Sequence, residues 1–468
     1  MKKFYLTTPI YYVNDKPHIG HAYTTIAADV IARYYRAKNK PVMFLTGTDE
    51  HGKKVAEAAE KNKTTPQQFV DDISGHFKSA WQKLNISNDY FIRTTDVNHV
   101  QVVNKVLRQL FKAGLIYKSN YEGLYCVSCE EFKTDKDLVD GLCAIHKTKP
   151  EKIKEECYFL KVSKYQSQLQ ELITKGDLEI SPQTRKNEII SFLKNEKLTD
   201  VAISRQKEKV DWGISLPFDK NYTTYVWVDA LLNYLTATNW PDKDFDQVWP
   251  PDLQLMAKDI LRIHSTVWPA IILGLGLKLP KKIFAHGFFT INGHKMSKSL
   301  NNVVDPVKLA DEYGADVVRY FLLREFTFGH DGDFNLERFA ERYNADLAND
   351  LGNLVQRILS LAKNNQIQTI PDKTKTLTEV EKDLENLKFK DALDRIWEFV
   401  VTANQEIELA EPWKLAKTEP VKFAKFIGEM VVKISLIANS LAPFMPKTSA
   451  QILKQIKTQE IEPIFPKK

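Results

Sequence analysis

The first 115 residues alternate between short apolar runs and longer stretches whose apolar residues recur at helical spacing. Residues 4–8 and 41–46 read as buried strands, and residues 17–35 read as a helix between them. This order predicts a doubly wound parallel sheet, in which ligands bind beyond the carboxyl ends of the strands. The alternation continues in later segments: residues 67–84, 98–113, 225–230, 253–257, 260–273 and 282–286. The predicted fold class is therefore α/β, with a Rossmann-like domain.

Two other regions depart from this alternation. Residues 116–224 combine short strands with a cysteine cluster, which indicates an inserted domain. After about residue 336 the chain reads as helices separated by prolines, the pattern of a separate α-helical bundle, with predicted helices over residues 344–363, 378–385, 390–409 and 419–441. A chain of 468 residues is long enough for several such domains.

The amino-acid composition limits the classes of protein to which the chain can belong. Hydrophobic residues make up 43% of the chain and charged residues 27%, the balance of a soluble globular protein. No apolar run is long enough to span a bilayer and no signal-peptide cleavage site is present, so we expect no membrane partner and a cytoplasmic location. The net charge of +6 permits a polyanionic partner without requiring one.

Two short motifs accompany the predicted sheet. The first reads HIGH at residues 18–21 and opens a helix, where backbone N–H groups favour phosphate, both imidazoles point to one side and Gly20 admits a ligand. The second reads KMSKS at residues 295–299, after a predicted Asn-Gly hairpin, and its lysines can neutralise a leaving pyrophosphate. Either motif alone could be solvated surface residues. Together, and without a Walker A sequence or dinucleotide fingerprint, they predict an ATP site.

The paired motifs resemble the signatures of class I aminoacyl-tRNA synthetases. Further residues narrow the resemblance to the methionyl-tRNA synthetase family, in its bacterial type with one zinc knuckle, over nearly the whole chain. It implies a methionine–tRNA ligase, required for translation initiation and elongation, in which the methionine carboxylate attacks the α-phosphate of ATP with Mg²⁺ and the methionyl group passes to tRNA(Met). The implied catalytic residues are His18, His21, Lys295 and Lys298. The implied ATP-binding residues are Asn14, His18, Gly20, His21, Asp259, Met296 and Lys298.

The amino-acid pocket is assigned by the resemblance, because the residues alone predict only an apolar, aromatic-rich pocket with one carboxylate nearby. A polarizable thioether suits aromatic edges, and Asp49 is implied to hold the ammonium group. The implied methionine-binding residues are Ile10, Tyr12, Asp49, Trp227, Ala230, Tyr234 and His286. Trp227 and Tyr234 could instead be core residues on a helix face. Homocysteine lacks only a methyl group, worth about 1–3 kcal/mol in a pocket, so binding alone discriminates weakly against it. The resemblance implies that the enzyme edits homocysteine.

One residue departs from the family pattern. Residues 256–260 resemble the ribose-binding segment, but Ala257 stands where the family normally has glycine. The added methyl could crowd the ribose or be absorbed by a small backbone shift. Asp259 remains to accept from the ribose hydroxyls.

Four residues are spaced as zinc ligands. Cys126 and Cys129 form one pair, Cys143 and His146 form the second, and 13 residues separate the pairs. Four protein ligands leave no open position, so the spacing predicts one structural Zn²⁺ per chain. Cys157 has no partner at such spacing and reads as a buried strand residue.

The helical C-terminal region contains a polar set at four-residue spacing, Asn349, Asn353 and Arg357, and a tryptophan, Trp413, at a later helix start. Such side chains can read or stack on unpaired bases, although periodicity alone would favour a solvated face. The resemblance implies that Asn353, Arg357 and Trp413 read the CAU anticodon.

The resemblance divides the chain into five stretches. These are residues 1–115 and 225–290, the halves of the catalytic Rossmann-like domain; 116–224, the connective insertion with the zinc knuckle; 291–340, the KMSKS loop and linker; and 341–468, the α-helical anticodon-binding domain. No extra nucleic-acid-binding domain follows in the sequence, so we expect a monomer. The alternatives are a sibling synthetase for leucine, isoleucine, valine or cysteine, a small-molecule nucleotidyltransferase, and a non-catalytic tRNA-binding relative.

Overall fold

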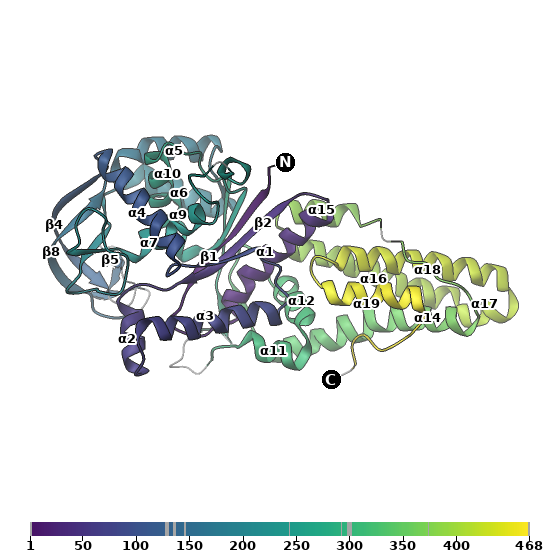
Figure 1. The fold of residues 1–468 in the computed structure, drawn as a ribbon. Helices are drawn as coiled ribbons and strands as arrows, with labels where there is room; N and C mark the ends of the chain where they lie inside the picture. The colour runs from purple at the N-terminus through teal and green to yellow at the C-terminus, as the bar shows by residue number, and fades with distance from the viewer. Residues whose placement is uncertain are drawn as a thin grey trace. The chain divides into compact units, whose positions relative to one another are not determined.

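The computed structural model describes residues 2–126, 131–133, 137–144, 147–242, 244–291, 293–296, 302–372 and 374–466 (Figure 1). The chain folds as two compact units, each built from three segments. The first unit comprises Met1–Pro17, Lys40–Ser79 and Asn88–Ala285, and the second comprises His18–Asn39, Ala80–Ser87 and His286–Lys468. None of the helices among the described residues is long and apolar enough to cross a membrane.

The first unit is organised around a six-stranded sheet with the order β3-β2-β1-β13-β14-β9. Its strands are β1 (Phe4–Tyr12), β2 (Val42–Asp49), β3 (Tyr90–Arg93), β9 (Glu179–Ser181), β13 (Leu253–Ala257) and β14 (Lys282–His286). β1 pairs in parallel with β2 and β13, β2 with β3, and β14 with β9. The predicted α/β class with a parallel sheet is therefore confirmed.

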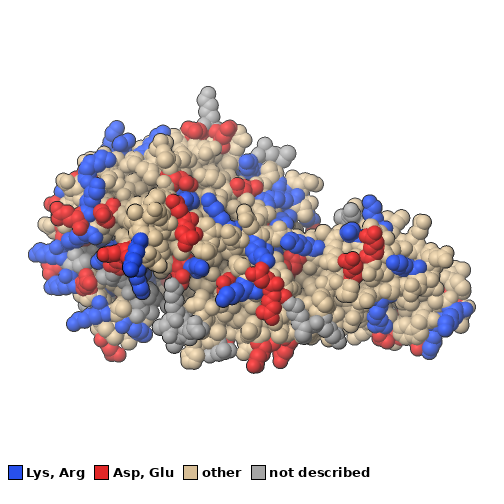
Figure 2. Space-filling model, turned by 60° about the horizontal axis from the view of Figure 1, so that its bottom comes forward, with Lys and Arg blue, Asp and Glu red and all other residues tan. Residues whose placement is uncertain are grey.

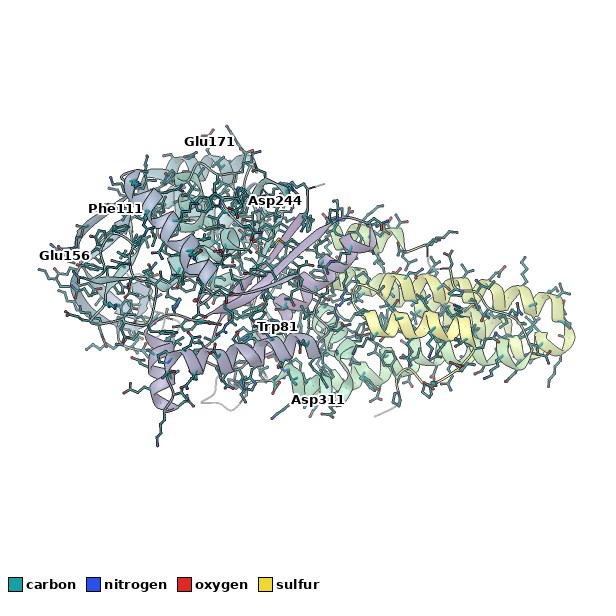
Figure 3. The ribbon with its side chains drawn as sticks, viewed as in Figure 1. Trp81, Phe111, Glu156, Glu171, Asp244 and Asp311 are labelled. Carbon is teal, nitrogen blue, oxygen red and sulfur yellow. The ribbon has the colours of Figure 1, made fainter. Side chains whose placement is uncertain are left out.

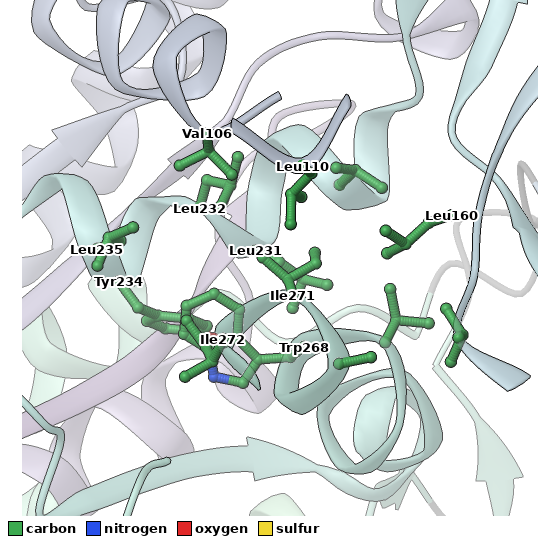
Figure 4. Close-up of a cluster of buried hydrophobic side chains, with 14 of the residues drawn as sticks. Val106, Leu110, Leu160, Leu231, Leu232, Tyr234, Leu235, Trp268, Ile271 and Ile272 are labelled. Carbon is green, nitrogen blue, oxygen red and sulfur yellow. The ribbon is translucent and has the colours of Figure 1, made fainter. Parts of the chain in front are cut away.

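Helices bury an apolar layer together with this sheet. They are α4 (Val97–Lys112), α5 (Gln166–Lys175), α6 (Gln183–Asn195), α7 (Val226–Leu231), α8 (Asn233–Thr236), α9 (Leu261–Ser265) and α10 (Val267–Gly274). Two more helices, α2 (Lys53–Lys61) and α3 (Pro66–Lys83), follow β2 in the chain, and the last residues of α3 belong to the second unit. Val106 and Leu110 from α4 meet Trp268 and Ile271 from α10 in this core (Figure 4). Each buried aliphatic side chain contributes about 1.5–3 kcal/mol to folding, so these contacts hold the helices that carry site residues.

The inserted region contains a four-stranded antiparallel sheet with the order β10-β8-β4-β5. Its strands are β4 (Ile116–Cys126), β5 (Glu131–Lys133), β8 (Glu151–Leu160) and β10 (Val201–Ala202), and two hairpins are made by β6 (Leu138–Val139) with β7 (Leu142–Cys143) and by β11 (Ser204–Gln206) with β12 (Tyr222–Thr224). β4 and β8 pair along almost their whole length. Lys118 on β4 forms an ion pair with Glu156 on β8 at 2.6 Å. Glu156 is labelled in Figure 3.

The second unit begins with α1 (Ile19–Ala37) and a three-stranded sheet with the order β16-β15-β17. Its strands are β15 (Phe289–Ile291), β16 (His294–Lys295) and β17 (Gly332–Phe334). The helices are α11 (Pro306–Tyr313), α12 (Ala315–Glu325), α13 (Leu336–Arg342), a π-helix (Tyr343–Gly352), α14 (Asn353–Asn364), α15 (Thr378–Glu385), α16 (Phe389–Ala410), α17 (Pro412–Thr418), α18 (Pro420–Leu441) and α19 (Pro446–Thr458). Proline opens α11, α17, α18 and α19, where its missing N–H costs nothing.

Two predicted helices differ from the observed ones. The segment predicted as one helix over residues 260–273 is divided at Thr266, whose φ of −127° and ψ of −66° interrupt the helical path between α9 and α10. The segment predicted as one helix over residues 344–363 is wound as a π-helix up to Gly352 and becomes α-helical at Asn353. Apolar periodicity does not distinguish the two windings over so short a span, because tertiary contacts decide which carbonyl each N–H reaches.

Candidate active site and anticodon-binding groove

The N-terminus of α1 holds the two histidines of the HIGH motif. His18 is the N-cap, and its Nδ1 accepts from the N–H of Gly20 at 3.0 Å. The Nδ1 of His21 accepts from the N–H of His18 at 3.2 Å. A nitrogen that accepts a hydrogen bond carries no proton, so each neutral ring carries its proton on Nε2. The sequence spacing predicts that both imidazoles point to one side, and in the structure the rings stack with centroids 3.8 Å apart.

His21 is held in its neutral form. Burial, together with the neighbouring His18, places the pKa of His21 well below its ordinary value of 6.5. Two neutral imidazoles with protons on Nε2, at the positive end of a helix, are suited to donate hydrogen bonds to phosphate oxygens.

Gly20 is required by His18 itself. A Cβ at position 20 would lie 2.9 Å from Cε1 and 3.0 Å from Nδ1 of the His18 ring, so any side chain would displace the imidazole. The same point is 3.6 Å from Cε of Met296, the second residue of the KMSKS motif. The second unit therefore brings Gly20 and Met296 together. Lys295 contributes its backbone to β16 opposite Thr290, and Lys298 lies outside the described residues.

His286, at the end of β14, is buried and hydrogen-bonded on both nitrogens. Its Nδ1 lies 2.7 Å from the carbonyl oxygen of Gly287, and its Nε2 lies 2.6 Å from Oγ1 of Thr24 on α1. Because a carbonyl only accepts, Nδ1 carries the proton and Nε2 accepts from the Thr24 hydroxyl. Burial lowers the pKa of His286 to about 4. In this arrangement the ring stays neutral and its Nε2 has no proton to offer to a thioether.

In the first unit, three predicted methionine-binding residues meet at the carboxyl ends of β1 and β2. Tyr12 pairs with Asp49 across the two strands, and the N–H of Val13 donates to the carbonyl of Asp49 at 3.1 Å. Ile10 and Tyr12 are two residues apart on β1, so their side chains share one face of the sheet. A buried carboxylate beside an aromatic and an aliphatic side chain is suited to an ammonium group attached to an apolar moiety.

The loop after Asp49 is fixed by contacts that the sequence analysis missed. His51 Nδ1 lies 2.6 Å from Oδ2 of Asp229 on α7, and His99 Nε2 on α4 lies 2.8 Å from Oδ1 of the same carboxylate. Burial opposes the charged form, yet His51 and His99 lower the pKa of Asp229 to about 2. Asp229 therefore joins three elements as an ionised acceptor. The only signal in the sequence is a single acidic residue inside the apolar run of residues 226–231.

Glu50, next to Asp49, is fixed equally firmly. Its fully buried carboxylate accepts from Nε and NH2 of Arg93 at 2.7 and 2.9 Å, and from the Thr48 hydroxyl at 2.6 Å. Trp212 donates from Nε1 to the Glu50 carbonyl at 2.6 Å. A bidentate guanidinium–carboxylate pair has one preferred geometry, so the loop that presents Asp49 is held on both sides.

The predicted pocket wall divides into one accessible residue and two buried ones. Trp227 on α7 is half-buried, whereas Ala230 and Tyr234 are buried. Tyr234 packs against Trp268 with ring centroids 5.4 Å apart (Figure 4). Its hydroxyl lies 2.9 Å from Nε2 of His264, whose Nδ1 bonds the carbonyl of Ile260. Tyr234 is thus also a core residue, the alternative that the sequence left open.

The ribose-binding segment lies at the carboxyl end of β13. Ala257 has φ of −80° and ψ of 156°, an extended conformation open to any residue, so glycine is not required there by the backbone. Asp259 follows in a short 3-10 turn and is exposed. Asn14, after β1, is exposed as well.

Two of the four predicted zinc ligands are described, and they lie close together. Cys126 ends β4 and Cys143 ends β7, and both are buried. The Cys126 Sγ lies 3.6 Å from Oγ1 of Thr148, and the Cys143 N–H donates to the Thr148 carbonyl at 2.8 Å. The Cys126 thiol and the Cys143 backbone therefore border one residue, which brings the two cysteines near each other as a shared metal ion would require. Cys129 and His146 lie outside the described residues, among which no group of three or more metal-binding side chains is found.

The predicted anticodon residues line one groove of about 500 Å³ in the second unit. Its lining residues are Asn353, Gln356, Arg357, Ser360, Leu361 and Trp413. The Arg357 guanidinium lies 5.9 Å from the centre of the Trp413 ring and 2.7 Å from the Glu408 carboxylate. Asn349, which lies in the π-helix, is not among the residues that line this groove. Acidic and basic side chains are interspersed over the face shown in Figure 2, in keeping with the mild net charge.

Comparison with known proteins agrees with this geometry. Residues 4–139 and 134–359 match the family model described as tRNA synthetases class I (M), and residues 361–467 match that of the anticodon binding domain of methionyl tRNA ligase. With a parallel sheet, a HIGH helix and a helical C-terminal region, the chain is a class I aminoacyl-tRNA synthetase.

The individual proteins that are similar to this chain are synthetases for one amino acid, methionine. The methionine–tRNA ligase of Clostridium acetobutylicum is 43% identical over 477 residues, which cover 98% of this chain and 74% of the relative. That of Thermotoga maritima is 40% identical over 98% of this chain and 76% of the relative. A structure of Mycobacterium tuberculosis methionyl-tRNA synthetase in complex with methionyl-adenylate superimposes with a TM-score of 0.93 at 38% identity and covers 100% of both chains.

The chain belongs to the methionyl-tRNA synthetase family. It is an enzyme that activates methionine with ATP to methionyl-adenylate and transfers the methionyl group to tRNA(Met), releasing AMP and pyrophosphate.

Proposed function

We propose that the stacked imidazoles at the start of α1 hold the ATP phosphates during this reaction. The observation that carries the proposal is that backbone N–H groups occupy Nδ1 of both His18 and His21, which leaves the protons on Nε2. Donors fixed before the substrate arrives need no reorganisation when charge develops at the α-phosphate. Lys295 and Lys298 neutralise the leaving pyrophosphate, and Mg²⁺ accompanies ATP. Asn14, Gly20, Asp259 and Met296 complete the ATP-binding set.

In the proposed methionine pocket, Asp49 accepts from the ammonium group. Ile10, Tyr12, Trp227 and Ala230 surround the side chain, and Tyr234 supports the pocket from the core. His286 contributes its neutral ring rather than a donated proton, since Nε2 accepts from Thr24. The same pocket accepts homocysteine, and the enzyme edits it. If the enzyme forms no thiolactone when it is given homocysteine and ATP, the editing proposal is wrong.

The insertion carries a structural Zn²⁺ in this proposal. Cys126, Cys129, Cys143 and His146 hold it, and when bound it ties the ends of β4 and β7 together. The proposal is supported by the common neighbour of Cys126 and Cys143, Thr148. Four protein ligands leave no position for substrate, so the ion takes no part in the chemistry.

At the other functional region, we propose that Asn353, Arg357 and Trp413 read the CAU anticodon in the groove that they line. Trp413 is 41% exposed, an unusual state for a tryptophan, and is therefore available to stack on a base. The Arg357 guanidinium is prepositioned over this ring. We further propose a cytoplasmic monomer with no membrane partner, divided into the five stretches predicted from the sequence.

The phosphate-binding role is tested by two substitutions at His18. His18→Asn places the amide oxygen near the position of Nδ1, where it can still accept from the Gly20 N–H and cap the helix. The substitution removes the Nε2 donor. It should lower methionine-dependent pyrophosphate exchange by about 10²–10³-fold, the usual cost of one such donor, without loss of thermal stability. His76→Asn, on the exposed surface of α3, is the matched control. Unchanged exchange in folded His18→Asn would refute the proposed role.

The anticodon role is tested by Trp413→Ala. Stacking on a base is worth about 1–3 kcal/mol, so charging of tRNA(Met) should fall by about tenfold or more while pyrophosphate exchange stays constant. Leu409→Ala removes another exposed apolar side chain outside the groove and should change neither rate. Equal charging of tRNA with and without a CAU anticodon by the parent enzyme would refute the proposed reading.

A further inference from the structure

Helix α1 contacts the anticodon-binding region at its C-terminal end. Tyr34 donates from its hydroxyl to Oε1 of Glu385 on α15 at 2.8 Å, and Lys38 forms an ion pair with Glu381 at 2.6 Å. Burial and the Glu385 carboxylate raise the pKa of Tyr34, so the hydroxyl keeps the proton that it donates. Since α15 lies within the residues that match the anticodon binding domain, one helix carries the HIGH histidines at its start and touches that domain at its end.

A second connection lies halfway along α1 and is buried. Asp29 accepts from NH1 of Arg319 on α12 at 2.7 Å, and neither side chain is exposed. Arg319 continues to the turn between α18 and α19, donating from Nε to the carbonyl of Phe444 at 2.7 Å and from NH2 to that of Pro443 at 2.9 Å. One guanidinium therefore joins the HIGH helix to the backbone of the anticodon-binding region.

The other groups around Asp29 complete the connection. Oδ1 accepts from the N–H and hydroxyl of Ser87 at 2.7 and 2.5 Å, and Oδ2 accepts from Arg33 at 2.6 Å. Burial would raise the pKa of Asp29, but Arg319 and Arg33 lower it below its ordinary value, so the carboxylate is ionised. A planar guanidinium with donors in fixed directions holds such an arrangement in one geometry, which a lysine ammonium does not reproduce.

We propose that Arg319 and Tyr34 are positioning residues for tRNA charging. They fix α1, and with it His18 and His21, relative to the anticodon-reading helices, so that a tRNA bound by its anticodon presents its 3′ end to the adenylate. The inference rests on the proposed roles of the HIGH histidines and of the groove around Trp413. In this proposal α1 acts as a rigid spacer. Because it is a helix and not a loop, it fixes the distance between the HIGH histidines at its start and the contacts with α15 at its end.

Loss of these contacts should affect the two half-reactions, methionine activation and tRNA charging, differently. Methionine-dependent pyrophosphate exchange needs no tRNA, whereas charging of the full tRNA needs both ends of it placed at once. Tyr34→Phe removes only a hydroxyl, and Arg319→Lys keeps a positive charge near Asp29 but loses the directed bonds to Pro443 and Phe444. Because small misplacements of a substrate can cost about 10²-fold, we expect kcat/KM for charging tRNA(Met) to fall by roughly tenfold in Arg319→Lys and roughly threefold in Tyr34→Phe. Exchange should stay within about twofold of the parent, because the phosphate donors themselves are untouched.

A third measurement, beside pyrophosphate exchange and charging of tRNA(Met), uses a short acceptor-stem RNA without an anticodon as the substrate. Because this RNA has no anticodon, its charging does not depend on the groove around Trp413, so both variants should charge it at the parental rate. Glu379→Gln is the matched control to Glu385→Gln: both lie on α15, but Glu379 pairs with Lys382 of the same helix, and among the described residues no hydrogen bond or ion pair joins it to α1. Glu385→Gln should reproduce Tyr34→Phe, and Glu379→Gln should leave all three rates unchanged.

Three outcomes would overturn the inference. Parental charging of tRNA(Met) by folded Tyr34→Phe and Arg319→Lys would show that these contacts position nothing. An equal loss in exchange, stem charging and tRNA charging would show that they only stabilise the fold, as would a loss that tracks the melting temperature. Failure of the underlying anticodon proposal is recognised separately, because the parent enzyme would then charge tRNA with and without CAU equally.

Discussion

His51 donates from Nδ1 to Oδ2 of Asp229 across 2.6 Å, with side-chain exposures of 8% and 0%. The bond joins the loop that presents Asp49 to the helix that carries Trp227 and Ala230. His99 donates to the other oxygen of the same carboxylate. The ammonium-binding and side-chain-binding parts of the proposed methionine pocket are thus connected through one buried ion.

The connection predicts the behaviour of Asp229→Asn. In asparagine one of the two carboxylate oxygens becomes an NH2 group, which donates and cannot accept from its imidazole. A charged hydrogen bond is worth about 1.5–3 kcal/mol, so KM for methionine should rise by about tenfold or more. KM for ATP should stay constant, as measured by pyrophosphate exchange. Asp200→Asn is the control, because Asp200 also accepts several bonds, from Ser163 and Tyr117, but in the inserted region. A parallel rise of both KM values would argue against a specific link to methionine.

Gly20→Ala is predicted to inactivate without unfolding. The new Cβ would lie 2.9 Å from the His18 ring and displace it. Displacement of about 1 Å costs roughly 10²-fold, which should appear in pyrophosphate exchange. Gly75→Ala on α3 is the matched control, because nothing lies within 4 Å of its added Cβ. That control should keep its activity and gain about 0.5–1 kcal/mol of stability from helix propensity.

Stability should fall as the solution becomes mildly acidic. Burial lowers the pKa of both His264 and His286 to about 4, against an ordinary value of 6.5. Between these values the unfolded chain binds protons that the folded chain does not, so the free energy of unfolding rises with pH. From pH 7.5 to pH 5 each histidine should cost about 2 kcal/mol.

Urea unfolding at these two pH values measures the loss. His264→Gln places a carbonyl where Nε2 accepts from Tyr234 and cannot titrate, so its stability should depend less on pH by about 2 kcal/mol over this interval. An unaltered pH dependence in His264→Gln would contradict the assignment.

The zinc proposal predicts one ion per chain in protein purified without chelators, measured by elemental analysis. Cys143→Ser should abolish it, because a hydroxyl is a poor substitute for a thiolate ligand. Cys157→Ser should retain it, since burial raises the pKa of Cys157 to about 12 and the thiol stays protonated. Absence of zinc from the parent protein, or its retention in Cys143→Ser, would contradict the proposal.

Local patterns in the sequence were sufficient for much of the fold. β14 over residues 282–286 and α15 over residues 378–385 have the predicted bounds, and α1 is displaced by only two residues. The placement of His18 and His21 on one side follows from their spacing at a helix start, and the structure adds that the two rings stack. These features depend on apolar periodicity and helix geometry, both of which are properties of neighbouring residues.

What the sequence by itself determined is the class of fold, the order of the motifs and the residue types available to each site. Only the tertiary structure decided how those residues are held. His51 and Asp229 are 178 positions apart, His99 and Asp229 are 130 apart, and Arg319 meets Asp29 from a distant helix. Burial gives these contacts their strength, since an ionised group removed from water must be paired, and no periodicity along the chain encodes which partner it meets.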